Sequence, residues 1–125
     1  MYSLGVKRKF SARHYLIGGD WGDENILHSH QYQMELVLEG RKLDRHGFLV
    51  DIDEVERHLD EVVTLFEEKT LNTLDGFTGL NPSIERLATL IHNLFKKRFA
   101  AFGLEALSVT IWEDDIAWTS YRASL

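Results

Sequence analysis

The run from His28 to Glu39 reads HSHQYQMELVLE, in which histidine or large apolar side chains alternate with mostly polar ones. Successive side chains on a β-strand point to opposite faces of the sheet, so this alternation predicts a long strand with one buried face. The same alternation places two imidazoles, those of His28 and His30, at the beginning of that face. The remaining members of the face are Tyr32, Met34, Leu36 and Leu38.

A third histidine ends an earlier run of the same kind. Met1 to Tyr15 is predicted as a first strand, in which Phe10, Ala12 and His14 share one side. Three neutral imidazoles that converge from two paired strands can bind one zinc ion and leave its fourth position open. That arrangement is typical of catalytic rather than structural zinc sites, so the pattern favours a small metalloenzyme.

The bulk composition narrows the class of protein. The chain has 125 residues and is 44% hydrophobic, which predicts one domain spanning residues 1–125. It has no cysteine, so disulfides, thiolate metal ligands and cysteine nucleophiles are excluded. No apolar stretch approaches the roughly 20 residues of a membrane span, and the N-terminus lacks a signal-peptide pattern, so we expect a cytoplasmic protein without membrane contact. The net charge of −6 argues against nucleic-acid binding.

Two helices are expected in the middle of the chain. Asp51 can cap the first helix, with Glu54 three residues later, and an apolar stripe continues this helix to about Lys69. The second helix is expected to begin with Asn81 as its cap and Pro82 in its first turn, where a missing N–H group costs nothing.

Two further strands are expected near the C-terminus, over residues 107–112 and 116–122, with a turn at Asp114 and Asp115 between them. The predicted order of elements is therefore ββααββ. A four-stranded antiparallel sheet with two helices belongs to the α+β class.

The histidine pattern still has two interpretations. A bare His-x-His on a strand is weak support for a metal site, because most such histidines are solvated or packed. The apolar face and the third histidine on a neighbouring strand favour metal binding here. For His46, in a turn, and for His58 and His92, on the helices, we expect solvated or packing roles.

Two carboxylates also have two interpretations each, and a third has one. Glu24, four residues before His28, is either solvated in its loop or a general base beside a hydroxyl that the metal polarises. Glu113 ends the apolar face of the third strand, and it either turns into solvent or accepts two hydrogen bonds from an amidine-like ligand edge. Glu85, in the first turn of the second helix, interacts favourably with the helix dipole.

Together these residues resemble the 6-pyruvoyltetrahydropterin synthase and 6-carboxytetrahydropterin synthase family over nearly the whole chain. Residues 10–14, FSARH, resemble the family's Phe-x-Ala-Ala-His, and residues 27–32, LHSHQY, resemble its Leu-His-Gly-His-x-Tyr. Four more segments are similar to family motifs: GFLVD at 47–51, LN at 71–72, PSIE at 82–85, and VTIWE at 109–113. The order and spacing of these motifs make the resemblance specific.

The resemblance implies a fold, a metal and a substrate. The fold is the tunnelling fold, or T-fold, in which ββααββ subunits join their sheets into a barrel, commonly a hexamer of two trimers with active sites between subunits. The metal is zinc, bound by His14, His28 and His30. The substrate is a small-molecule pterin whose 2-amino and N3 edge is held by Glu113, with Glu85 as a weaker candidate nearby.

The chain departs from the family at its catalytic residues. The family's usual catalytic cysteine corresponds to Glu24, its Asp-His pair to Glu67 and Glu68, and the glycine between the two histidines to Ser29. A branch of the family that has glutamate in place of the cysteine converts 7,8-dihydroneopterin triphosphate largely to 6-hydroxymethyl-7,8-dihydropterin, a folate precursor. This chain resembles that branch at Glu24.

The leading hypothesis is therefore a zinc-dependent lyase that acts on the side chain of 7,8-dihydroneopterin triphosphate, with Glu24 as the base. One alternative is a step like that of 6-carboxytetrahydropterin synthase, on the way to queuosine. A second alternative is a non-catalytic pterin-binding protein that keeps Glu113 and has lost the catalytic relay.

Overall fold

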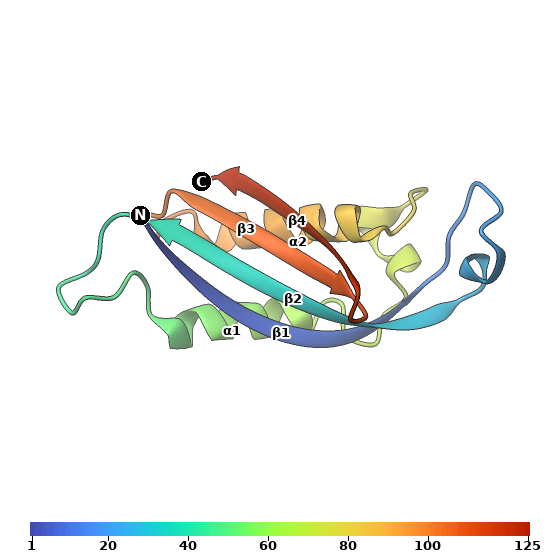
Figure 1. The fold of residues 1–125 in the computed structure, drawn as a ribbon, viewed down its shortest axis with the longest axis horizontal. Helices are drawn as coiled ribbons and strands as arrows, with labels where there is room; N and C mark the ends of the chain where they lie inside the picture. The colour runs from blue at the N-terminus through green and yellow to red at the C-terminus, as the bar shows by residue number, and fades with distance from the viewer.

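The computed structural model describes residues 1–125, and its elements follow the predicted ββααββ order (Figure 1). The order along the chain is β1 (Tyr2–His14), β2 (His28–Gly40), α1 (Ile52–Val63), α2 (Ile84–Phe99), β3 (Ala106–Glu113) and β4 (Ala117–Ser124). Three short 3₁₀ turns lie in the connections: η1 (Gly22–Asn25), η2 (Leu71–Thr73) and η3 (Asp75–Phe77). The predicted α+β class and topology are thus confirmed.

The four strands form one antiparallel sheet in the order β1-β2-β3-β4. The register pairs His14 of β1 with His28 of β2, at the end of the sheet from which the β1–β2 connection extends. On the other side of β2, Tyr32 is paired with Glu113, the last residue of β3. This register brings His14, His28 and Glu113, from three strands, to one end of an otherwise apolar face.

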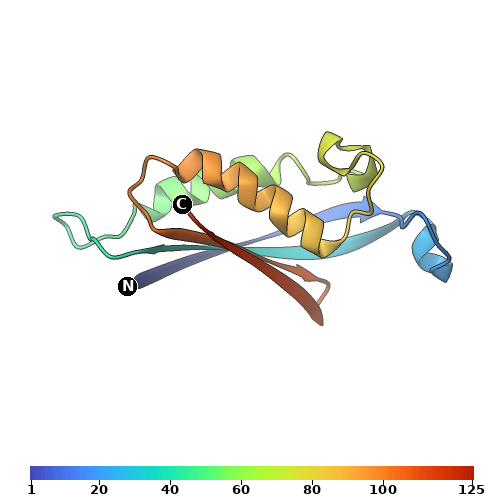
Figure 2. The same ribbon diagram turned by 90° about the horizontal axis from the view of Figure 1, so that it is seen from above.

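Both helices cover the same face of the sheet, and the opposite face has no covering element (Figure 2). The core lies between the helices and the inward sheet face, which explains the strict alternation along β2. None of the helices is long and apolar enough to cross a membrane. The largest fully buried side chains are Tyr32, Phe10, Phe77, Phe95, Phe99, Met34, Leu36, Leu38, Leu59, Leu71, Leu87 and Ile91.

Helix α1 begins where predicted and ends earlier than predicted. Asp51 is its N-cap and accepts a hydrogen bond from an N–H group of the first turn. The expectation of a helix to Lys69 was wrong, because α1 ends at Val63. The N–H group of Glu68 donates to the carbonyl of Ser11 at 2.7 Å, so this segment leaves the helix to hydrogen-bond to the edge of β1.

The N-cap of helix α2 lies two residues later than predicted. Ser83 is the N-cap and accepts a hydrogen bond from the N–H group of Arg86, so the assignment of Asn81 as cap was wrong, and Pro82 precedes the helix. The Asn81 side chain instead accepts from the N–H of Ile17 at 2.7 Å and donates to its carbonyl at 3.1 Å. Asn81 therefore holds the β1–β2 connection.

Candidate metal centre

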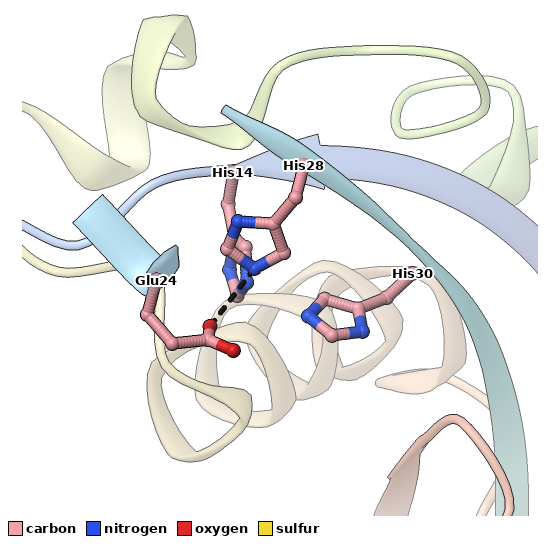
Figure 3. Close-up of side chains that lie close together, drawn as sticks. All are labelled: His14, Glu24, His28 and His30. Carbon is pink, nitrogen blue, oxygen red and sulfur yellow. Dashed lines mark ion pairs between the residues drawn. The ribbon is translucent and has the colours of Figure 1, made fainter. Parts of the chain in front are cut away.

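Three histidines from β1 and β2 converge at one end of the sheet (Figure 3). Their ring centroids lie 4.6 Å apart for His14 and His28, 4.9 Å for His14 and His30, and 4.8 Å for His28 and His30. With Glu24, they offer four ligand atoms that all lie within 4.8 Å of one another. The structure thus brings together the three predicted metal ligands and the carboxylate predicted beside them.

Two of the imidazoles are fixed by backbone carbonyl groups. His14 Nδ1 lies 3.1 Å from the carbonyl oxygen of Pro82, and His28 Nδ1 lies 2.6 Å from that of Ile26. A carbonyl oxygen can only accept, so each Nδ1 carries the proton and donates it. The Nε2 atom of each ring is therefore left with its lone pair free, which is the form in which histidine binds a metal.

The third imidazole is fixed by a side chain. His30 Nδ1 lies 2.8 Å from Oδ2 of Asp114, in the turn between β3 and β4. A carboxylate is an acceptor as well, so this ring adopts the same tautomer as the other two. Sequence reasoning assigned Asp114 only to a turn and missed this contact. The two carbonyl acceptors leave no signal in a sequence, whereas a carboxylate directly after Glu113 does.

The three Nε2 atoms are buried and have no hydrogen-bond partner within the chain. Buried polar atoms in folded proteins almost always have a partner, so three neighbouring exceptions indicate a ligand that the protein itself does not supply. Burial also lowers the pKa of His14, which favours the neutral, metal-binding form. A set of three such imidazoles fits a zinc ion.

Glu24 approaches this cluster from η1. Its Oε2 lies 2.9 Å from Nε2 of His28, and no hydrogen bond joins these two atoms, because the neutral ring carries its proton on Nδ1. The Glu24 side chain is 49% exposed, so its carboxylate can reach solvent or a bound molecule as well as the cluster. This position supports either a fourth metal ligand or a base beside the metal.

The loop that carries Glu24 is held in place by asparagine side chains. Asn72 accepts from the N–H of Tyr15 at 3.0 Å and donates to its carbonyl at 2.9 Å, as Asn81 does for Ile17. The carbonyl of Glu24 accepts from the N–H group of Leu16 at 2.8 Å. The connection after β1 is therefore fixed by paired hydrogen bonds that resemble those of a sheet.

Glu113 lies on the same inward face, as its alternation predicts. Its Oε1 is 3.3 Å from Nε2 of His30, and its side chain is 27% exposed. Burial raises the pKa of Glu113, and the negative charge of Glu24 raises it further. Glu113 is thus turned towards the cluster rather than into solvent.

The remaining candidates lie outside the four-residue group. Glu85 is exposed in the first turn of α2. Glu67 accepts a hydrogen bond from the backbone of β1 at 3.2 Å. His46 is exposed, His58 packs against an aromatic ring, and His92 is buried with a backbone partner, as expected for solvated or packing histidines.

The sequence is similar to known proteins along nearly its whole length. A sequence model of the family described as 6-pyruvoyl tetrahydropterin synthase matches residues 3–124. A protein of Archaeoglobus fulgidus, provisionally named 6-carboxy-5,6,7,8-tetrahydropterin synthase, is 25% identical over 119 residues, which cover 95% of this chain and 94% of that protein.

Two solved structures share the fold along nearly their whole length. The 6-pyruvoyl tetrahydropterin synthase of Caenorhabditis elegans superposes with a TM-score of 0.87 at 20% identity, over 98% of this chain and 96% of that one. A catalytic-residue variant of the Plasmodium vivax 6-pyruvoyltetrahydropterin synthase superposes with a TM-score of 0.83 at 13% identity, over 99% of this chain and 98% of that one. At these identities the likeness shows the fold, which confirms the predicted T-fold. The family match over residues 3–124 shows that this chain belongs to the 6-pyruvoyl tetrahydropterin synthase family.

Proposed function

We propose that this chain is a zinc-dependent lyase that acts on the side chain of 7,8-dihydroneopterin triphosphate, with the metal held by His14, His28 and His30. The observation that carries the proposal is the set of three buried Nε2 atoms without partners, next to a carboxylate. Family membership supports the pterin as substrate.

Glu24 is the base in this proposal. It lies at hydrogen-bond distance from one metal-ligand nitrogen, so it can also reach a substrate hydroxyl placed at the centre. A bound zinc ion would supply Lewis acidity that lowers the pKa of such a hydroxyl. Two of the Plasmodium vivax structures that match this fold carry a replaced catalytic glutamate, which supports a glutamate in this role.

Glu24 takes the proton from the 2′-hydroxyl of the side chain. The C1′–C2′ bond then breaks in the retro-aldol sense: a carbonyl forms at C2′, and the released electron pair passes from C1′ into the conjugated pterin ring. Return of the proton from Glu24 to C1′ leaves 6-hydroxymethyl-7,8-dihydropterin. No oxidant or second substrate is needed.

Glu113 holds the pterin ring. Its carboxylate is partly buried and faces the cluster, so it can accept two hydrogen bonds from the 2-amino and N3 edge of a ring bound there. Glu85, exposed at the start of α2, is the second candidate for this contact.

A second candidate function is the reaction of 6-carboxytetrahydropterin synthase. The Archaeoglobus fulgidus relative, 25% identical, favours it. The two reactions cleave or rearrange the same kind of side chain and release different products. Chromatography of the products therefore distinguishes them.

The decisive experiment is turnover of 7,8-dihydroneopterin triphosphate by the purified, zinc-loaded protein, with products separated by chromatography. We expect Glu24→Gln to lower turnover by roughly 10²–10⁴-fold, because the amide cannot take a proton. Asp23→Asn is the matched control: it removes a neighbouring exposed carboxylate of η1 outside the metal-ligand cluster, and should leave turnover unchanged.

Three results would contradict parts of this proposal. Full activity of Glu24→Gln removes Glu24 from the mechanism. A 6-carboxytetrahydropterin product supports the second candidate. No product at all, together with pterin binding that still depends on Glu113, identifies the chain as a non-catalytic pterin-binding protein.

A further inference from the structure

We propose that Asp114 is a positioning residue of the metal centre, which holds the His30 imidazole in the tautomer and orientation that present Nε2 to the metal. The inference rests on the proposed centre of His14, His28 and His30. It assigns a role to a residue of the β3–β4 turn that touches neither metal nor substrate.

The contact geometry carries this inference. Asp114 Oδ2 lies 2.8 Å from His30 Nδ1, the distance of a charge-assisted hydrogen bond. The His30 side chain is only 10% exposed, whereas that of Asp114 is 56% exposed. The carboxylate therefore holds a nearly buried ring from the protein surface.

His30 differs from the other two histidines in the partner of its Nδ1 atom. His14 and His28 donate to backbone carbonyl groups, which are neutral and fixed by the fold. A carboxylate partner adds negative charge to the ring, and such outer partners raise the basicity of a metal-binding histidine. Asp114 is thus expected to strengthen the bond from His30 as well as to orient the ring.

The register explains why a turn residue reaches this ring. The last pair between β2 and β3 joins Tyr32 to Glu113, so His30, two residues before Tyr32, lies beside the turn rather than beside β3. Asp114 has a φ of 57°, in the left-handed region that aspartate tolerates better than most residues. This conformation ends the strand alternation, and the side chain lies against His30 instead of on the outer face.

The left-handed conformation also provides a sharp test. Glycine adopts a φ near 57° without strain, so Asp114→Gly removes the carboxylate while the turn keeps its preferred conformation. Asp114→Asn keeps an oxygen acceptor and removes the charge. Asp115→Asn is the matched control, because Asp115 is the next carboxylate of the same turn and no hydrogen bond or ion pair joins it to His30.

The measurement is the zinc affinity of each purified protein, by competition with a chromophoric chelator at one fixed pH. We expect Asp114→Gly to weaken zinc binding about 10- to 100-fold, Asp114→Asn to weaken it less, and Asp115→Asn to leave it unchanged. Thermal unfolding in excess chelator should show that the Asp114→Gly variant is folded. His30→Ala, which removes the ligand itself, sets the scale of a full loss.

The outcomes separate this inference from the proposed function. Wild-type affinity in Asp114→Gly overturns the role of Asp114 and leaves the metal centre intact. An equal loss in Asp115→Asn shows a general effect of charge and also overturns it. A wild-type protein that binds no zinc overturns both the centre and the inference.

Discussion

Two carboxylates approach the histidine cluster, and their surroundings differ. Glu24 contacts His28 Nε2 at 2.9 Å from a loop, whereas Glu113 contacts His30 Nε2 at 3.3 Å from the end of a strand. The Glu24 side chain is nearly twice as exposed. A general base must exchange its proton with the surroundings, and a residue that anchors a ring must keep its position, so this difference in exposure supports the proposal of proton transfer by Glu24 and ring binding by Glu113.

The first prediction at the residue scale concerns Glu113. We expect Glu113→Gln to weaken binding of a dihydropterin by about 1–3 kcal/mol, because the amide presents a donor to the ring's own donors. Titration calorimetry measures this change, and zinc content should be checked in the same sample because Glu113 contacts His30. Glu85→Gln serves as comparison, and a larger loss there would transfer the anchoring role to Glu85.

The sequence predicts the histidines of the site and misses what orients them. Alternation along two strands is enough to place His14, His28 and His30 on one face, because a strand leaves each side chain only two faces. The contact of Asp114 depends on one left-handed residue that ends the alternation. The carbonyl groups of Ile26 and Pro82 depend on loop paths that side-chain patterns do not encode.

At the scale of elements, tertiary hydrogen bonds decide where the helices end. The apolar stripe of α1 continues past its end at Val63 to the buried Phe66, so periodicity predicts a longer helix. The edge of β1 offers unpaired backbone groups, and Glu68 and Lys69 bond to them instead of to α1. Such partners lie more than 50 residues away in sequence, so local patterns cannot reveal them.

A buried histidine links α2 to the sheet and makes this packing sensitive to acid. His92 Nε2 donates to the carbonyl of Leu107 at 3.0 Å, and its ring packs edge-on against Tyr121. Burial lowers the pKa of His92 from its ordinary value of 6.5, although the bond to Leu107 opposes this shift. The folded state therefore holds His92 neutral at a pH where the unfolded chain already binds a proton.

The second prediction, at the element scale, follows from this difference. The contribution of neutral His92 to the free energy of unfolding is fully present above about pH 6.5. It is lost as the pH falls from there to the pKa of His92 in the folded state, because the unfolded chain binds the extra proton. In His92→Gln, which cannot titrate, the fall should be smaller. Urea unfolding of the unmodified protein and of His92→Gln, from pH 7.5 to pH 5 in excess chelator, measures the fall in the free energy of unfolding. Parallel curves would show that His92 does not contribute.

At the scale of the whole molecule, the sheet is left open in two directions. β1 and β4 are edge strands, and the face opposite the helices is uncovered. β4 and its turn expose large apolar side chains, with Ile116 92% and Trp118 62% exposed. Open edges and apolar surface of this kind are usually closed by another chain. We therefore propose that the chain forms a homo-oligomer, and the resemblance to the family implies a hexamer in which sheets join into a barrel.

The third prediction separates metal binding from assembly. All four candidate ligands belong to one chain, so zinc binding should survive dissociation, whereas a pterin site completed between subunits should not. Light scattering should give six times the 14.5 kDa of one chain. Trp118→Lys, which places a charge beside Trp112 on the uncovered face, should give smaller species that keep zinc and lose turnover. A wild-type monomer with full turnover would contradict the assembly and place the complete active site within a single chain.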